Sequence, residues 1–339
     1  MAASCRVYIF LSAFVLAGAM FKKGSKQLAV PEKTHATASA LKQKHPEPNF
    51  VELGSGSAGS AGKVMSDVVT PATPELLAAE PLKWMHTPKC GTSFLNALIH
   101  LPGVCPGVDH SFNIDTERYG PHFEIGFQFM DCPNRCDPKK FVCQPHGDTT
   151  HMGIGDKYET EFKGHLVANF REPIQRILSA FYDTEFSHGV KDGDSPASYA
   201  KKVEHFMTCQ IMNGGVMDPL PPFCLELTET DANLAVARLR EGFAFVGIME
   251  EWDLSMCLFH RMFGGDCLAA DFLDNRPTYG EDSSLHLYDT SVLGGFEDPV
   301  DRILYNGAKD IFAERLLAYN VSQESCQPCF EQARSGAAV

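Results

Sequence analysis

The sequence predicts an α/β domain in which helices flank a central parallel sheet, and three observations carry this prediction. Short apolar runs typical of buried strands alternate with segments of helical period. One such run, residues 84–95, breaks at a proline and restarts as a helix, as in a strand–loop–helix unit. The chain has 339 residues, of which 44% are hydrophobic and 21% charged, so it can bury one large core.

The first 26 residues predict entry into the secretory pathway. An apolar run over residues 7–21 follows Arg6 and precedes three lysines within the next five residues. Two interpretations of 1–26 stay open: a cleaved signal peptide with Ala17-Gly18-Ala19 as its cleavage site, or an uncleaved signal anchor, short for a span of about 20 residues. The first gives a secreted protein and the second a single-pass type II protein of the Golgi membrane, whose bilayer is thinner than that of the plasma membrane.

Residues 27–80 predict a flexible stem or linker. They are rich in Ala, Ser, Gly and Pro and show no apolar period, so they offer too little apolar surface to offset the entropy of ordering. A propeptide or a disordered tail is the alternative. A folded domain over 81–325 and a C-terminal tail over 326–339 complete the predicted organisation.

Four strands and four helices are predicted within the domain. The strands are Leu82–Met85, Phe141–Pro145, His165–Phe170 and Phe243–Ile248. The helices are Ser93–Leu101, Ile174–Phe186, Trp252–Phe263 and Pro299–Tyr319. Ligands of parallel sheets bind at the carboxyl ends of the strands, so the loops after Met85, Pro145 and Phe170 are expected to converge on one crevice.

The cysteines predict disulfides in an oxidising compartment. Of the 12 cysteines, all but Cys5 follow the apolar segment, which leaves an odd number and therefore at least one free thiol. The expected pairs are Cys209–Cys224, Cys257–Cys267 and Cys326–Cys329, with Cys132, Cys136 and Cys143 as a second cluster. A zinc site made of Cys132, Cys136, Cys326 and Cys329 is the alternative, but the spacing and the compartment favour disulfides. Asn320-Val321-Ser322 is a glycosylation sequon if the domain is lumenal.

The loop Pro88-Lys89-Cys90-Gly91-Thr92-Ser93 predicts an anion site. Between a strand and a helix it would aim backbone N–H groups and the Lys89 charge at one spot, where a phosphate or sulfate group would bind. A P-loop kinase would place its lysine after a second glycine, whereas here Lys89 precedes the glycine. A cysteine phosphatase would need an arginine where Asn96 follows Cys90. The net charge of −14 argues against nucleic-acid binding.

A second segment, residues 165–182, predicts a partner for this loop. Arg171 stands at the end of a strand, Pro173 suits the first turn of a helix, and Gln175 and Ser179 share one face of that helix. Arg171 and Ser179 could therefore hold a second phosphate near the first. Taken alone, the segment also fits a capped helix with a surface arginine.

Together the two segments resemble the nucleotide motifs of sulfotransferases. Residues 88–93 resemble their 5′-phosphosulfate loop, and Arg171-Glu172-Pro173-x-x-Arg176-x-x-Ser179-x-Phe181-Tyr182 resembles their 3′-phosphate motif. The segment Phe245–Trp252, followed by a helix with Phe259-His260, resembles a later strand and helix of the membrane-associated, Golgi-type carbohydrate sulfotransferases. The resemblance covers roughly residues 81–320 and would make the domain a single P-loop-like one.

The resemblance implies transfer of a sulfuryl group from 3′-phosphoadenosine 5′-phosphosulfate to an acceptor hydroxyl, of a carbohydrate above all. Lys89 would stabilise charge on the bridging oxygen, and Gly91, Thr92 and Ser93 would supply backbone and hydroxyl donors. Pro88 and Cys90 belong to the same binding loop around the phosphosulfate. Arg171 and Ser179 would bind the 3′-phosphate, and Arg276 is a candidate contact in a closing loop. No metal is expected. The alternative is a catalytically silent lumenal protein of the same fold that binds a nucleotide or a glycan.

Several residues are candidates for the catalytic base. Relatives of the Golgi type often place a histidine at the end of the second strand, where His146 stands, and His151 follows closely. An imidazole with a pKa of about 6.5 can accept a hydroxyl proton at lumenal pH. Glu124, Asp148 and His110 are further candidates, and His86 is expected to pack or to orient its neighbours.

Overall fold

The computed structural model describes residues 72–114, 123–143, 151–183, 188–217, 219–275 and 287–336. All of them belong to one compact unit, Met65–Val339. Three predicted site residues, His146, Asp148 and Arg276, lie outside the described residues, and so does the side chain of Glu124. The predicted signal segment 1–26 lies outside them as well.

The described residues contain a parallel sheet in the strand order β2-β1-β4-β6. Its strands are β1 (Leu82–Trp84), β2 (Phe141–Val142), β4 (Leu166–Phe170) and β6 (Phe243–Ile248). Every residue of β4 is buried, as expected of a central strand covered on both faces. The predicted α/β fold is confirmed. A small antiparallel pair that the sequence did not predict joins β3 (Met152–Ile154) to β5 (Gly214–Val216).

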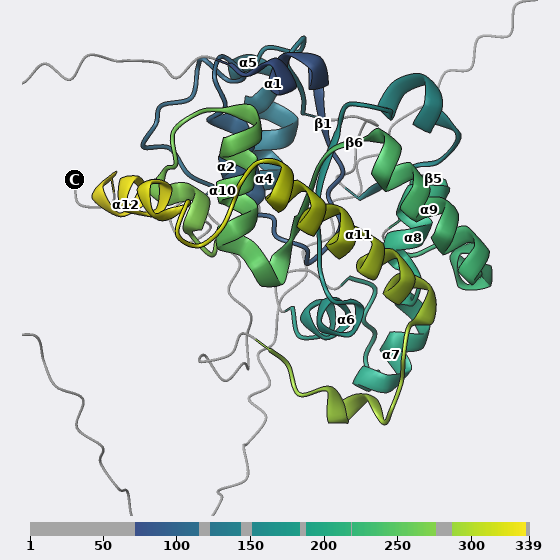
Figure 1. Ribbon diagram of the computed structural model, residues 1–339. Helices are drawn as coiled ribbons and strands as arrows, with labels where there is room; N and C mark the ends of the chain where they lie inside the picture. The colour runs from purple at the N-terminus through teal and green to yellow at the C-terminus, as the bar shows by residue number, and fades with distance from the viewer. Residues whose placement is uncertain are drawn as a thin grey trace, which may run out of the picture. The chain divides into compact units, whose positions relative to one another are not determined.

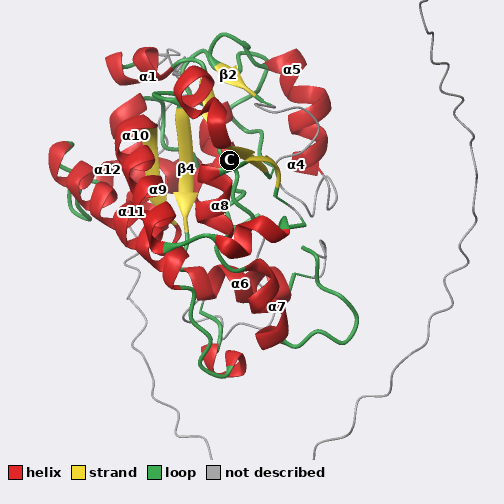
Figure 2. Ribbon diagram, turned by 90° about the vertical axis from the view of Figure 1, so that its right-hand side faces the viewer, coloured by secondary structure: helices red, strands yellow, loops and turns green. Residues whose placement is uncertain are grey.

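Helices follow the strands as predicted. After β1, β4 and β6 come α2 (Phe94–Ile99), α6 (Pro173–Phe181) and α10 (Trp252–Phe263). Figure 1 shows α2 and α10 on one side of the sheet and α8 (Phe206–Met212) and α9 (Glu229–Gly242) on the other. In Figure 2, β4 points toward α6, which lies beyond the carboxyl end of the strand. The long helix α11 (Pro299–Ala318) packs on α9 and β6.

The remaining helical elements connect or cover these. The α-helices are α1 (Pro74–Ala79), α4 (Phe123–Gly126), α5 (Cys132–Arg135), α7 (Pro196–Val203) and α12 (Gln327–Gly336). The 3-10 helices are η2 (Gly155–Lys157), η4 (Pro222–Glu226), η5 (Met249–Glu251), η6 (Ala269–Phe272) and η7 (Thr290–Leu293), and the π-helices are η1 (Phe127–Asp131) and η3 (Tyr158–Phe162). No helix of the described part is both long and apolar enough to cross a bilayer.

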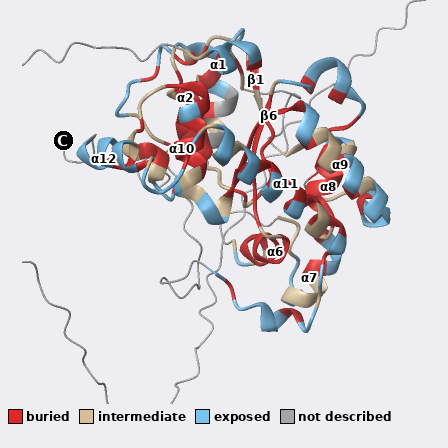
Figure 3. Cartoon of the chain, in the orientation of Figure 1, coloured by how far each residue is buried: buried red, intermediate tan, exposed pale blue. Residues whose placement is uncertain are grey.

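Three packed aromatic side chains hold together the helices that carry the site. The ring of Phe94 on α2 lies 5.5 Å from that of Phe245 on β6 and 4.9 Å from that of Phe259 on α10. All three are fully buried, and Figure 3 shows that α2 and α10 bury most of their residues. Edge-to-face and offset pairs of this kind add to the area that they bury. Helices α2 and α10 are thereby held against each other and against β6.

Elements at both ends of the domain extend beyond its predicted bounds. Helix α1 lies within the predicted stem, yet Leu76 is fully buried. The hydroxyl of Thr73 caps this helix and donates to the carbonyl of Met262, 2.6 Å away. At the other end, α12 packs against η6 within the predicted tail. The folded unit therefore includes residues before 81 and after 325.

Five disulfides join ten of the described cysteines. They are Cys105–Cys136, Cys132–Cys143, Cys209–Cys224, Cys257–Cys326 and Cys267–Cys329. The predicted pair Cys209–Cys224 is confirmed, and so is a cluster around Cys132, where Cys136 takes Cys105 as its partner. The free thiol among the described cysteines is Cys90, which is buried.

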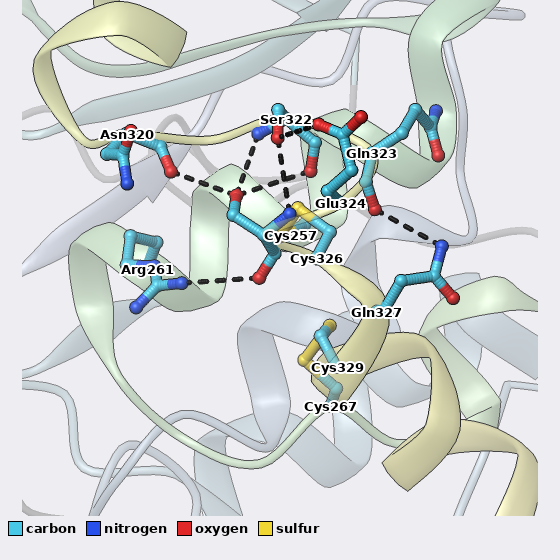
Figure 4. Close-up of a disulfide and its surroundings, with 11 residues drawn as sticks. Cys257, Arg261, Cys267, Asn320, Ser322, Gln323, Glu324, Cys326, Gln327 and Cys329 are labelled. Carbon is cyan, nitrogen blue, oxygen red and sulfur yellow. Dashed lines mark hydrogen bonds between the residues drawn. A yellow bond between two sulfur atoms is a disulfide. The ribbon is translucent and has the colours of Figure 1, made fainter.

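The predicted pairs Cys257–Cys267 and Cys326–Cys329 are wrong. The C-terminal segment folds back so that Cys326 reaches α10 and Cys329 reaches the loop before η6 (Figure 4). Because Cys257 lies near Cys267 in the sequence, and Cys326 near Cys329, local pairs were predicted. In the folded chain the C-terminal segment lies beside α10 and the loop after it, so each cysteine pairs with one of the other segment. The zinc site that would have used Cys326 and Cys329 is wrong for the same reason, because both sulfurs are bonded elsewhere.

Two buried aspartates at the start of α11 anchor α8. The Asp301 carboxylate accepts hydrogen bonds from the N–H groups of Met207 (3.0 Å) and Thr208 (2.8 Å), the first turn of α8. Asp298 accepts from the N–H groups of His205 (2.8 Å) and Asp301 (3.1 Å). Burial and the neighbouring Asp301 carboxylate raise the pKa of Asp298 to about 7. The folded chain therefore binds a proton at Asp298 that the unfolded chain releases.

We expect the free energy of unfolding to fall as the pH rises from about 4 to about 7. A carboxyl group whose pKa is raised by folding stabilises the fold below its unfolded pKa, and that contribution is lost as the pH rises through the folded pKa. Urea unfolding over this range measures the effect, and Asp298→Asn should flatten the curve. Asp289→Asn, at the exposed cap of η7, is the control. An equal slope in Asp298→Asn and the unmodified chain would contradict the expectation.

Candidate functional site

A cavity of about 640 Å³ opens where β1, β4 and β6 end. Its walls come from the loops that follow these strands, from α6 and from the segments around η6 and α12. The lining residues are Lys89, Gly91, Thr92, Ser93, Arg171, Ser179, Met249, Glu250, Glu251, Trp252, Asp253, Leu254, Phe272, Leu273, Asp274, Leu287 and Gln323. Six of them belong to the nine site residues predicted for the donor. Pro88 and Cys90 lie buried in the same loop without lining the cavity.

The loop after β1 is held in a conformation that requires glycine at one position. Lys89 and Gly91 both have left-handed backbones, with φ of 64° and 88°. A Cβ atom on Gly91 would lie 2.6 Å from Cζ3 of Trp252. No hydrogen bond of the described part uses the N–H groups of Gly91, Thr92 and Ser93. These donors stand at the wall of the cavity, where an anion could accept from them.

Gly91→Ala should therefore weaken both the fold and any anion binding at this loop. The added methyl group meets the indole of Trp252 and the backbone must leave its left-handed region, which together cost about 1–3 kcal/mol. The measurement is urea unfolding combined with titration by adenosine 3′,5′-bisphosphate. Gly294→Ala is the matched control, because Gly294 has a φ of 61° but open space around it. Equal losses in the two variants would show that the contact with Trp252 has no effect.

Helix α8 holds the loop after β1 in place by hydrogen bonds. The Thr87 hydroxyl donates to Oε1 of Gln210 (2.6 Å), and Nε2 of Gln210 donates to the carbonyl of His86 (2.9 Å). Nε2 of His86 lies 3.1 Å from the hydroxyl of Thr92. The His86 ring stacks on Trp84 at 4.4 Å, which agrees with the packing and orienting role expected of it.

Lys89 forms an ion pair that the sequence did not predict. Its Nζ lies 2.7 Å from Oδ2 of Asp183, and the same oxygen lies 3.1 Å from Nε2 of His188. The three side chains are 14%, 6% and 8% exposed, so little water separates their charges. The hydroxyl of Tyr199 donates to the carbonyl of His188 (2.9 Å) and fixes this residue. Asp183 and His188 follow the second motif, but no local pattern marks them.

Arg171 and Ser179 reach the same cavity from the strand end and from α6. Arg171 donates from Nη1 to the carbonyl of Lys89 (3.3 Å), and its guanidinium lies 6.0 Å from the centre of the Tyr288 ring. Oγ of Ser179 is buried and has no hydrogen-bond partner in the described part. An unsatisfied buried hydroxyl at a cavity wall is ready to bond to a ligand.

Two other polar residues of α6 do not line the cavity. Gln175 exchanges hydrogen bonds with the backbone of Tyr288, at 3.1 Å and 2.7 Å, and so fastens that segment to the helix. Arg176 is buried, donates to the carbonyl of Val203 (3.0 Å) and lies over the ring of Phe206. Of the helical motif, therefore, Arg171 and Ser179 alone line the cavity.

The indole of Trp252 forms part of the apolar wall, and Asp271, which holds it by its backbone carbonyl, belongs to a buried ion pair. Trp252 donates from Nε1 to the carbonyl of Asp271 (2.9 Å), and the Asp271 carboxylate lies 2.9 Å from Nε2 of His260. Burial by itself would lower the pKa of His260, but the charge and the hydrogen bond of Asp271 outweigh it and raise that pKa. Leu254, Phe272 and Leu273 extend the wall. The cavity thus combines two cationic side chains, polar groups and an apolar face, and four acidic residues, Glu250, Glu251, Asp253 and Asp274, also line it.

The surroundings of Cys90, in the loop, and of Glu250, at the cavity wall, limit the chemistry of both side chains. Burial raises the pKa of the Cys90 thiol to about 12, so it stays protonated and is no nucleophile. Glu250 accepts from the N–H of Glu172 (2.9 Å) and the hydroxyl of Tyr305 (2.9 Å). It thereby ties the loop after β6 to α6 and α11.

The two base candidates whose side chains the structure describes, His151 and His110, lie in different parts of the domain. The ring of His151 lies 5.0 Å from that of His86 and 6.2 Å from that of His188, so three histidines stand side by side behind the loop. His110 is exposed, with its ring 6.3 Å from that of His100, and does not line the cavity. The structure therefore brings His151 near Lys89 through His188 and places His110 elsewhere.

No family model, curated protein sequence or solved structure matches this chain.

Proposed function

We propose that the protein is a sulfotransferase that moves a sulfuryl group from 3′-phosphoadenosine 5′-phosphosulfate to an acceptor hydroxyl. The observation that carries the proposal is the meeting of Lys89, Arg171 and Ser179 in one cavity at the carboxyl ends of parallel strands. A ligand with two separated anionic groups and a flat ring system between them would match the two cationic side chains and the apolar lining of this cavity. The resemblance of residues 88–93 and 171–182 to the motifs of Golgi-type sulfotransferases supports the same ligand and a P-loop-like domain.

The chemistry needs what these residues offer. Sulfuryl transfer, like phosphoryl transfer, runs in line through a transition state with charge spread over oxygens, so positioning and electrostatic donors supply most of the catalysis. Lys89 and the N–H groups of Gly91, Thr92 and Ser93 would stabilise the charge that grows on the departing 5′-phosphate. Arg171 and the Ser179 hydroxyl would bind the 3′-phosphate, and Trp252 would offer its ring to the adenine.

The disulfides support a lumenal site of action. Five disulfides in one domain are typical of proteins in an oxidising compartment such as the secretory pathway. Asn320, the first residue of the sequon, is exposed and stands in the turn before α12 (Figure 4). These features fit a Golgi enzyme, anchored or secreted, that acts on the hydroxyl of a glycan.

Two measurements test the function. In a thermal-shift experiment, adenosine 3′,5′-bisphosphate should stabilise the protein and ATP should not, because only the first carries a 3′-phosphate. A labelled donor is then offered with a panel of glycans, tyrosine peptides and small alcohols. Binding of the bisphosphate without transfer to any acceptor would instead support a silent binding protein of the same fold.

A further inference from the structure

A buried ion pair lies behind the apolar wall of the cavity. His260 on α10 and Asp271 in η6 have side chains that are 5% and 0% exposed, and Nε2 of the histidine lies 2.9 Å from Oδ2 of the aspartate. Neither residue lines the cavity, but Phe272, Leu273 and Asp274, which follow Asp271 directly, do. The steps of sulfuryl transfer described above give this pair no role.

The hydrogen bonds of His260 give its ring a positive charge. Its Nδ1 lies 3.2 Å from the carbonyl oxygen of Gly264, and its Nε2 faces Asp271. Oδ2 of Asp271 also accepts from the N–H of Leu268 (2.8 Å). Carbonyl and carboxylate oxygens only accept hydrogen bonds, so both ring nitrogens must carry a hydrogen to bond to them. The ring is therefore an imidazolium, and it is paired with a carboxylate.

The pair fixes one end of the segment that forms the wall, residues 271–275. The backbone carbonyl of Asp271 accepts from Nε1 of Trp252 (2.9 Å) and so sets the position of the indole. At the other end of the segment, the N–H of Asn275 donates to the hydroxyl of Ser93 (3.1 Å), in the anion loop. The wall segment therefore connects the buried pair and the indole to the loop that carries the anion donors.

We propose that His260 and Asp271 are positioning residues that hold the indole of Trp252 and the wall segment in place for a flat ring of the ligand. The identity of that ring, the adenine of the sulfate donor, rests on the proposed sulfotransferase function. Neither residue touches the ligand, because both act through Trp252. An indole that is already fixed loses little conformational entropy when a ring binds against it, so the pair contributes to affinity.

Two probes separate the ring of the ligand from its phosphates. Adenosine 3′,5′-bisphosphate carries the base, and ribose 3,5-bisphosphate has none. His260→Gln keeps a hydrogen-bond donor for Asp271 but removes the charge, and should weaken binding of the first probe about tenfold in isothermal titration while leaving the second unchanged. His165→Gln is the control, since His165 bonds to the carbonyl of Ala79 before β4 begins. Equal weakening of both probes by His260→Gln would overturn the positioning role.

A double-mutant cycle tests whether the effect passes through the indole. With Trp252→Ala present, His260→Gln should cause no further loss of affinity for adenosine 3′,5′-bisphosphate, because no ring remains to be positioned. An undiminished tenfold loss would contradict the proposal. If His260→Gln alone does not fold, the same titrations use it combined with Asp271→Asn, which replaces the ion pair by two neutral amides.

The imidazolium gives the affinity a pH dependence of defined sign. Burial lowers the pKa of His260, but the charge and hydrogen bond of Asp271 outweigh it and raise that pKa above the ordinary 6.5. The charged pair is therefore complete at pH 6.5 and is lost as the pH rises through the raised pKa. Among the described residues, Asp271 and Asp266 act on His260, and His100 of α2 faces Asp271. Affinity for adenosine 3′,5′-bisphosphate should fall above pH 6.5 relative to that for ribose 3,5-bisphosphate, and His260→Gln should abolish this change.

The fluorescence of Trp252 reports on the indole without any ligand. The chain has two tryptophans, so subtracting the spectrum of Trp252→Phe leaves the signal of Trp252. His260→Gln should increase the quenching of this signal by acrylamide, and unchanged quenching would overturn the pair as a positioning device. Failure of the unmodified protein to bind adenosine 3′,5′-bisphosphate would overturn the sulfotransferase function instead, and the quenching would still decide whether the pair holds the indole.

Discussion

Replacing Lys89 by methionine is expected to reduce sulfuryl transfer by about 10²–10³-fold, the loss expected when one preorganised donor to a developing oxyanion is removed. Lys89 is the one lysine among the residues that line the cavity. Methionine keeps the length and the apolar stem of the side chain but cannot stabilise a departing phosphate. The loss should appear in kcat in the labelled-donor assay.

Lys89→Met also removes the lysine that pairs with the buried Asp183 carboxylate, so part of any loss could come from a weaker fold. Lys89→Met combined with Asp183→Asn removes the buried negative charge as well and should recover stability in urea unfolding, but not transfer. Lys202→Met is the matched control, since Lys202 pairs with Asp194 on the surface. A doubly substituted protein that regains activity would exclude a direct role of Lys89 in the chemistry.

Arg171→Met is expected to weaken binding of adenosine 3′,5′-bisphosphate about 100-fold, because a charge-assisted hydrogen bond to a phosphate is lost. Binding of adenosine 5′-phosphosulfate, which has no 3′-phosphate, should change far less. Isothermal titration of both nucleotides therefore measures how much more Arg171→Met weakens the affinity for the bisphosphate than the affinity for the phosphosulfate. Arg261→Met, an exposed arginine of α10, serves as the control.

Ser179→Ala tests the second residue that is proposed to bind the 3′-phosphate. Its hydroxyl is buried without a partner, so removing it costs the fold no hydrogen bond, and the stability of the free protein should be equal or higher. Affinity for the bisphosphate should nevertheless fall several-fold. Loss of stability together with unchanged affinity would mean that Ser179 packs α6 and does not meet the 3′-phosphate.

Elements with a clear apolar periodicity were predicted correctly from the sequence, and short elements without one were missed. Helix α10 and strand β6 have the bounds that their apolar periodicity indicated. Helix α6 is shorter than predicted, because it ends at Phe181 and Tyr182 is its C-cap. The pair β3–β5 was missed, since each strand has three residues and two of those in β5 are glycines. Short strands of that kind carry no period that a sequence could reveal.

The chain by itself determined which segments become the sheet and which two motifs stand at its carboxyl edge, because parallel strands place their ends together whatever their order. Only the tertiary structure decided what surrounds Lys89. Its ion pair with Asp183, the approach of Trp252 to Gly91 and the pairing of Cys326 with Cys257 join residues far apart in sequence. Such contacts depend on how complete elements pack, and no spacing along the chain encodes them.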